Sequence, residues 1–224
     1  MAELAQDTEL RIKRVLNTIE SGTPDGNYSC ISIYNDGHNE TRQITYGCSQ
    51  TTEQGNLKDL VKRYISASGK YSQELTPYID KIGAISLADD KDFIKLLEKA
   101  GSDEVMKVVQ DSFFDEDYFQ PSMDWATANG FILPLSKLVI YDSFVQSGHI
   151  LMEIRNTFSE RPPRNGGDEK LWIIFYLRAR LIFLQNSRNP DVRKSVYRVK
   201  DYQQAINNNN WNMNNPIVVQ GFFV

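Results

Sequence analysis

Two carboxylates near the N-terminus have the residue types and the settings of a general acid and a general base. Glu20 follows residues 12–19, whose apolar side chains recur at i, i+3, i+4 and i+7 as on one face of a helix. Asp36 lies in the turn sequence Asn35-Asp36-Gly37, after an alternating, strand-like segment at residues 29–34. One carboxyl group is therefore expected beside apolar packing and the other on a wet turn. Different surroundings allow two carboxyl groups to hold opposite protonation states, as acid–base catalysis requires.

Two further charged residues fall on apolar helix faces. Asp142 is at the i+7 position of the stripe that begins at Leu135, and Arg180 has the same position in the stripe that begins at Ile173. Burying one unpaired charge is costly, whereas an aspartate and an arginine that meet can be tolerated, so we expect these two residues to pair. The alternative is that one of the two side chains extends to solvent.

The elements that would position these residues are mainly helical. Helical patterns are expected at 57–64, 75–82, 90–100, 104–119, 135–147 and from an Asp168 N-cap to about Gln185. Gln120-Pro121 is expected to end the fourth of them, and the acidic residues 115–117 are interpreted as a solvated corner. The Asn-rich stretch 207–210 precedes Trp211 and an apolar end, which favours an ordered tail packed on the body.

Composition indicates an ordinary globular protein. The chain has 224 residues, 41% of them hydrophobic and 24% charged, which suits one domain over residues 1–224 with two lobes. A net charge of −4 gives no case for nucleic acid or an anionic membrane as a partner, and a cationic partner is easier to accommodate. No apolar run is long enough to span a membrane. The first residues, MAELAQDTELRIK, lack the apolar centre of a signal peptide, so we expect either a cytoplasmic protein or a mature form.

The chain has two cysteines, Cys30 and Cys48, and neither lies in a C-x-x-C or His-rich pattern. We therefore expect no metal site. The two residues fall on neighbouring predicted strands, so a disulfide and two small buried thiols both remain open.

Several short motifs occur together in a specific order. They are Glu20 after a helix, Asp36-Gly37 with Thr41 five residues on, Tyr46-Gly47-Cys48, Tyr141-Asp142-Ser143-Phe144-Val145, Gly166-Gly167-Asp168-Glu169 and Arg178-Ala179-Arg180. In order and rough spacing the combination resembles the chitosanases of glycoside hydrolase family 46. The resemblance implies a lysozyme-like, mainly α fold (α+β) of two lobes, with a small antiparallel sheet beside a substrate cleft.

The resemblance also implies a role for each matching residue. Glu20 corresponds to the general acid, Asp36 to the general base and Thr41 to the threonine that helps to hold the attacking water. Arg180 looks like the arginine that contacts the acid and Asp142 like its partner, which is the pair already inferred from burial. The remaining assignments are Arg164 in the same network and Glu169, Glu53, Arg42 and Tyr34 as substrate contacts.

The sequence departs from the family pattern in two loops. After Asp36 it has His38-Asn39-Glu40 where many members have a Gly-rich loop, so the catalytic loop is expected to sit differently. The loop of residues 49–56 looks longer than usual, so that an expected acidic residue corresponds either to Glu53 or to Asn56. Tyr34, like other tyrosines near the sheet, is open to two interpretations, a sugar platform or part of the core.

The implied activity is endo-acting, inverting hydrolysis of β-1,4 linkages in chitosan, without a cofactor or metal, by a secreted monomer. Acidic residues along the cleft would attract this cationic polysaccharide. Two alternatives remain open: a lysozyme-like hydrolase of another amino-sugar polymer such as peptidoglycan, and a non-catalytic binding protein on the same fold.

Overall fold

The computed structural model describes residues 6–48 and 50–224. Contacts divide the chain into two compact units. Unit 1 contains the residues up to Ile19 together with Glu116–Val224, and unit 2 contains Glu20–Asp115. The sequence-based expectation that they act as one catalytic domain stays a prediction.

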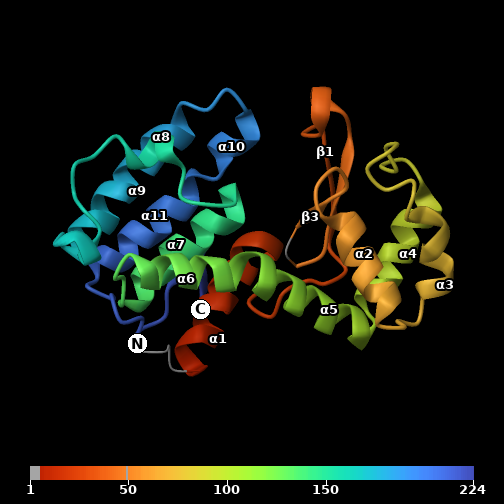
Figure 1. The fold of residues 1–224 in the computed structure, drawn as a ribbon, viewed down its shortest axis with the longest axis horizontal. Coiled ribbons are helices and arrows are strands. Elements are labelled where there is room, and N and C mark those ends of the chain that lie inside the picture. The colour runs from red at the N-terminus through yellow and green to blue at the C-terminus, as the bar shows by residue number, and fades with distance from the viewer. Residues whose placement is uncertain (1–5, 49) are drawn as a thin grey trace. The chain divides into compact units, whose positions relative to one another are not determined.

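Unit 2 holds the small sheet and the helices that cover it (Figure 1). Strands β1 (Ile31–Tyr34), β2 (Gln43–Tyr46) and β3 (Thr51–Thr52) are antiparallel in that order, with Tyr34 opposite Gln43. The helices are α2 (Leu57–Ser66), α3 (Ser72–Leu75), η2 (Thr76–Tyr78), α4 (Lys91–Gly101) and α5 (Glu104–Phe114), and a short turn η1 (His38–Glu40) follows β1. The predicted apolar stripe of α2 is confirmed, since Leu57, Leu60, Val61 and Tyr64 are all buried.

The predicted end of the fourth helical pattern at Gln120-Pro121 is wrong. The helical backbone continues from α5 through a π-helical turn, η3 (Asp115–Phe119), into α6 (Gln120–Ala128). Proline is tolerated here because it occupies the first turn of α6, where a helix can do without its N–H group. On α5 the buried residues are Met106, Gln110, Phe113 and Phe114, whereas Val108 is 64% exposed.

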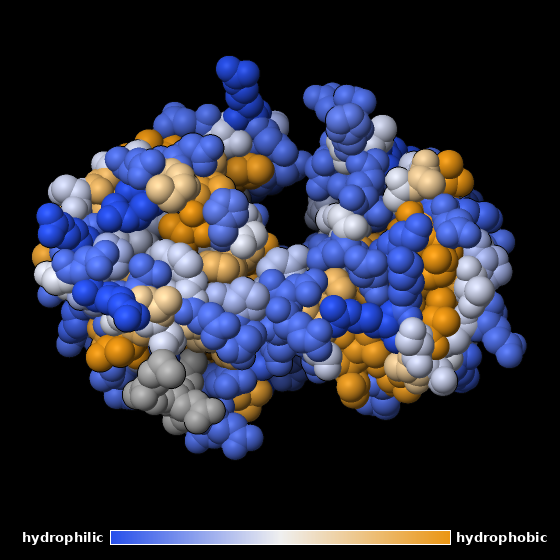
Figure 2. All heavy atoms as spheres, viewed as in Figure 1, coloured by the Kyte–Doolittle hydropathy of each residue, from blue (hydrophilic) through white to orange (hydrophobic). Residues whose placement is uncertain are grey.

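Unit 1 contains α7 (Pro134–Ser147), in which residues 135–144 are all buried, and α9 (Glu169–Gln185), which buries one stripe and leaves Leu171, Ile182 and Phe183 exposed. Its other elements are α1 (Gln6–Ser21, which ends in unit 2), α8 (Met152–Arg155), η4 (Pro163–Asn165), α10 (Pro190–Lys194), α11 (Val196–Asn207), β4 (Val218–Val219) and β5 (Phe222–Phe223). Asp168 caps α9 as predicted, with Oδ1 accepting the Leu171 N–H at 2.9 Å. The face of the molecule seen in Figure 2 is mainly hydrophilic, with apolar patches between the hydrophilic residues.

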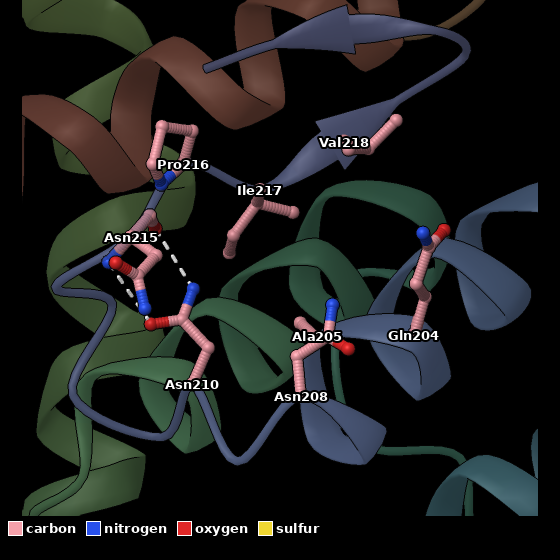
Figure 3. A pocket seen from close by; sticks show the side chains of 8 residues that line it. All are labelled: Gln204, Ala205, Asn208, Asn210, Asn215, Pro216, Ile217 and Val218. Carbon is pink, nitrogen blue, oxygen red and sulfur yellow. Dashed lines mark hydrogen bonds between the residues drawn. The ribbon is translucent and has the colours of Figure 1, made fainter.

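The Asn-rich stretch is ordered, as predicted. The Asn210 side chain donates to the Asn215 carbonyl at 2.8 Å and accepts the Asn215 N–H at 3.1 Å (Figure 3). Trp211 is only 5% exposed. The Asn210 amide therefore binds both the N–H and the carbonyl of Asn215 and holds the tail at this point.

Cys30 and Cys48 form no disulfide, which excludes one of the two alternatives left open by the sequence; Cys48 is buried and Cys30 is half-buried. The Gly47 N–H donates to the Cys30 carbonyl at 2.8 Å, so Gly47 rather than Cys48 lies opposite Cys30. Since successive residues of a strand point to opposite faces, this offset by one residue disfavours a disulfide.

Candidate active site

Glu20 lies in the last turn of α1, which ends at Ser21, and its side chain is half-buried. The preceding residue, Ile19, is buried with the rest of the apolar stripe of α1. The sequence-based placement of Glu20 at a helix end beside apolar packing is therefore confirmed. Its role as general acid stays a prediction at this point.

Asp36 lies in the same unit, two residues after the end of β1, and its side chain is exposed. Its Oδ1 atom accepts a hydrogen bond of 2.9 Å from Nε2 of Gln43, the first residue of β2. The predicted position on a wet corner after a strand is confirmed, and the structure adds a buried donor that holds the carboxylate.

The loop after Asp36 is folded tightly back on itself. Gly37 N–H donates to the Thr41 carbonyl at 3.0 Å, and the Thr41 hydroxyl donates to the His38 carbonyl at 2.9 Å. A Cβ atom on Gly37 would lie 2.6 Å from Thr41 Oγ1, so only glycine fits. Asn39 and Glu40 have φ angles of 56° and 58°, a left-handed conformation that non-glycine residues rarely adopt. Because Asn39 and Glu40 stand where many family members have glycines, the backbone of this turn is strained.

Glu53 does not lie on a sugar-binding surface, so this sequence-based assignment needs correction. It is 1% exposed, and its carboxylate accepts the Ile44 N–H at 3.1 Å and the Leu87 N–H at 2.6 Å. Burial raises the pKa of Glu53, and these two backbone donors oppose the rise. The residue ties β2 to the segment before α4 and is structural.

The other two predicted substrate contacts of unit 2 are at the surface. Tyr34 is 44% exposed at the end of β1, which favours the platform interpretation over the core. Arg42 makes an exposed ion pair with Asp89, with Nη1 and Oδ1 2.7 Å apart. The charge of Arg42 is therefore partly compensated before any substrate binds.

Unit 1 contains the predicted buried ion pair. Asp142 Oδ2 lies 2.5 Å from Arg180 Nη2, and the two side chains are 0% and 2% exposed. A second arginine, Arg198 on α11, donates to Asp142 Oδ1 at 2.8 Å. Burial alone would raise the pKa of Asp142, but the charges of Arg180 and Arg198 outweigh it and hold the pKa below its usual value. The pair inferred from the sequence is confirmed and is part of a triad.

Arg198 takes the place in this cluster that the sequence assigned to Arg164. Arg164 is exposed on η4, where its side chain donates to the Ala128 carbonyl at 3.2 Å. The sequence contained a signal for Arg198, because Tyr202 and Ala205 follow it at i+4 and i+7 and are both buried. A charged residue on this apolar stripe is the same pattern that revealed Asp142 and Arg180.

Glu169 has a structural contact in addition to its predicted role. Its Oε1 atom accepts the N–H groups of Ile132 and Leu133, at 3.0 and 2.8 Å, directly before α7. One carboxylate oxygen therefore fixes the start of the helix that carries Asp142. Contact of Glu169 with a sugar stays a prediction.

Two pockets of unit 1 contain none of the predicted site residues. One has a volume of about 280 Å³ and lies between α11 and the C-terminal tail, where Gln204, Asn208 and Pro216 are among its lining residues (Figure 3). The other, of about 460 Å³, is an open depression at residues 156–159 and Phe175. Among the described residues no group of three or more His, Cys, Asp or Glu could hold a metal ion, and none of the described helices is long and apolar enough to cross a membrane.

Comparison with known proteins decides the family. The model of "Glycosyl hydrolase family 46" matches residues 14–217, nearly the whole chain. The chain belongs to glycosyl hydrolase family 46. It is 26% identical over 240 residues to the chitosanase of Bacillus subtilis strain 168, an alignment that covers 98% of this chain and 84% of that protein.

Solved structures of this family have the same fold. The native chitosanase from Bacillus subtilis MY002 matches with a TM-score of 0.86 at 24% identity, over 99% of this chain and 100% of that one. The GH46 chitosanase from Gynuella sunshinyii, solved with chitotetraose, matches with a TM-score of 0.86 at 23% identity, over 99% and 98% of the two chains. The sequence-based recognition of the family and of its mainly helical, lysozyme-like fold with a small antiparallel sheet is confirmed.

Proposed function

We propose that this family 46 glycoside hydrolase is an endo-acting, inverting chitosanase that cleaves β-1,4 linkages between glucosamine units. The observation that carries the proposal is the setting of two carboxylates in unit 2: Glu20 is half-buried at the end of a helix, and Asp36 is exposed on a turn with one oxygen held by a neutral donor. The chitosanase relatives support the substrate, since one of them binds chitotetraose.

In the proposed reaction Glu20 donates a proton to the leaving oxygen while Asp36 takes a proton from the attacking water. Glu20 lies in the last turn of α1, directly after the buried Ile19, so its position on this helix is fixed by the apolar stripe. Inversion requires space for the water, and in inverting enzymes the two carboxyl groups stand roughly 6.5–9.5 Å apart.

Thr41 is proposed to help hold this water. Its hydroxyl donates to the His38 carbonyl and accepts a hydrogen bond of 2.8 Å from Gln54 Nε2. A hydroxyl oxygen has two lone pairs, so one remains to accept a hydrogen from water.

The substrate class follows from charge and surface. A glucosamine polymer is cationic, and a protein with net charge −4 attracts it, more strongly at low salt. We assign Tyr34 as a platform for a sugar ring and Glu169 as a partner for an amino group, while Glu53 is excluded by its burial. The protein is further proposed to act as a secreted monomer.

The first test is the release of reducing ends from chitosan, chitin and bacterial cell walls by the wild type and by Glu20→Gln. We expect activity on chitosan and its loss in Glu20→Gln, because an amide cannot supply the proton, while the thermal unfolding midpoint stays close to that of the wild type. Preference for cell walls would favour a peptidoglycan hydrolase instead. Inactivity of the wild type on all three polymers would favour a binding protein.

The second test concerns Asp36 and the stereochemistry. Asp36→Asn should be nearly inactive, and azide, which needs no base, should restore turnover by attacking from the side that water uses. The glycosyl azide should therefore have the configuration opposite to that of the cleaved linkage, as the wild-type product does. Proton NMR of the first product distinguishes the two anomers. Substantial activity of Asp36→Asn without azide would exclude this residue as the base.

A further inference from the structure

We propose that Gln43 and Gln54 form a brace that positions the base and its loop for the reaction. The inference rests on the proposed role of Asp36. Gln43 is 5% exposed at the start of β2, and Gln54 is exposed just after β3, so the brace extends from the interior of unit 2 to its surface.

The chain itself fixes the orientation of the Gln43 amide. Its Oε1 atom accepts the backbone N–H of Gln54 at 3.0 Å, and a backbone N–H can only donate. Nε2 must therefore face the other way, where it donates to Asp36 Oδ1 at 2.9 Å. An amide N–H also only donates, so Oδ1 is the accepting oxygen of this hydrogen bond and the other oxygen is left to take a proton.

This hydrogen bond restricts a side chain that would otherwise be mobile. Asp36 is exposed, and an exposed aspartate can rotate about two side-chain bonds. With Oδ1 held by Gln43, the carboxylate keeps one orientation and leaves Oδ2 for the proton of the attacking water. Reactions of this kind depend strongly on orientation, because a small displacement of a reacting group costs a large part of the rate.

Gln54 acts on the other end of the same loop. Its Oε1 atom accepts the His38 N–H at 2.5 Å, and its Nε2 atom donates to Thr41 Oγ1 at 2.8 Å. Between these two contacts lie Asn39 and Glu40 in the left-handed conformation, which persists only where surrounding contacts impose it. The backbone of Gln54 thus orients Gln43 and its side chain orients Thr41, so one residue relates the base to the water-holding hydroxyl.

The main experiment replaces Gln43 by Met, which keeps the length and most of the volume but removes both hydrogen bonds. We expect kcat on chitosan to fall by about 10- to 100-fold, the range for a hydrogen bond to a charged group, with little change in KM. Thr45→Val is the matched control: it lies on the same strand, is 4% exposed, and among the described residues its hydroxyl has no partner. The control should keep wild-type kcat.

Azide separates positioning of the base from a general structural role. In Asp36→Asn the azide ion replaces the activated water, so the azide-rescued rate should be the same with and without Gln43→Met. An equal loss of rate in the rescued background would show that Gln43 acts elsewhere and would overturn the inference. Wild-type kcat in Gln43→Met, with Asp36→Asn inactive, would also overturn it while leaving the proposed function intact. An active Asp36→Asn would instead refute the base assignment, and the brace with it.

A second variant serves if Gln43→Met unfolds. Gln54→Met changes an exposed side chain and keeps the backbone N–H that binds Gln43, so circular dichroism and thermal unfolding should match the wild type. The kcat of this variant should fall because the loop that carries Thr41 loses the two hydrogen bonds that the Gln54 side chain makes to it, at His38 N–H and at Thr41 Oγ1. A wild-type kcat in Gln54→Met would refute the role of the brace in holding this loop.

Discussion

Asp142→Asn provides the most direct test of the buried cluster in unit 1. The substitution keeps the shape of the side chain but removes the charge that two arginines share. Arg180 is 2% exposed and Arg198 is 10% exposed, so water cannot replace the lost carboxylate at either guanidinium. We therefore expect a large loss of stability from a change of one atom.

The magnitude follows from the geometry of the cluster. Breaking a buried ion pair by removal of one partner typically costs about 3–5 kcal/mol, and Asp142 is the partner of both arginines at 2.5 and 2.8 Å. For a protein of this size each kcal/mol lowers Tm by roughly 2–4 °C, so Tm should fall by roughly 6–20 °C. Arg180→Met should cost less, because it leaves the contact between Asp142 and Arg198 in place.

Urea unfolding of both single variants and of Asp142→Asn with Arg180→Met checks the coupling. We expect the double variant to be more stable than the sum of the two single losses predicts, by about 0.5–3 kcal/mol, because residues in one network are not additive. Strict additivity, or a loss below about 1 kcal/mol in Asp142→Asn, would show that the cluster does not stabilise the fold in the way its geometry suggests.

The acid limb of the stability curve gives a second measurement on the same residue. The arginines hold the pKa of Asp142 below its usual value, so its contribution to stability is fully present above about pH 4 and is lost as the pH falls through the lowered pKa. The stability of Asp142→Asn should therefore depend less on pH in this range. An equally steep acid limb in the variant would assign the loss to other groups.

Three other substitutions test single contacts. Glu53→Gln should destabilise by about 1–3 kcal/mol in urea unfolding, because its NH₂ group would face a backbone donor, Ile44 or Leu87; unchanged stability would contradict these two contacts. Gly37→Ala should lower kcat at least about tenfold, since its Cβ would displace Thr41, and normal kinetics would show that the loop can relax. Asp168→Ala should lower stability by about 1 kcal/mol with unchanged kcat, and no change in Tm would argue against the cap.

The spacing of apolar residues along the sequence correctly predicted those helices in which apolar side chains are the buried ones. The apolar stripes of α2, α7 and α9 are where the sequence placed them. Asp142 and Arg180 lie on two of these stripes, which predicted their burial, and two buried opposite charges were expected to pair. The placements of Glu20 and Asp36 were likewise readable, one from the end of a stripe and one from turn residues after a strand.

The wrong or missing predictions concern residues whose position depends on backbone hydrogen bonds or on backbone conformation. Glu53 was expected at the substrate surface because the family resemblance implies an acidic residue there. In the structure two backbone N–H groups bind its carboxylate inside unit 2, and a pattern of side-chain types does not indicate such donors. Pro121 was expected to end a helix, but the π-helical turn before it places the proline in a first turn. The contacts of Gln43 and Gln54 depend on a loop conformation that no short motif specifies.

Glu53 and Asp142 show that the number of partners of a buried carboxylate does not by itself determine the direction of its pKa shift. Each carboxylate has two partners, yet the pKa of Asp142 is lowered and that of Glu53 is raised. The difference is that guanidinium groups bring full positive charges, whereas backbone donors offset burial only in part. A raised pKa means that the stabilising contribution of Glu53 is present below about pH 4.3 and is lost as the pH rises through the raised value. Between mildly acidic and neutral pH the urea stability of the wild type should therefore decline more than that of Glu53→Gln, and parallel curves would refute this account of Glu53.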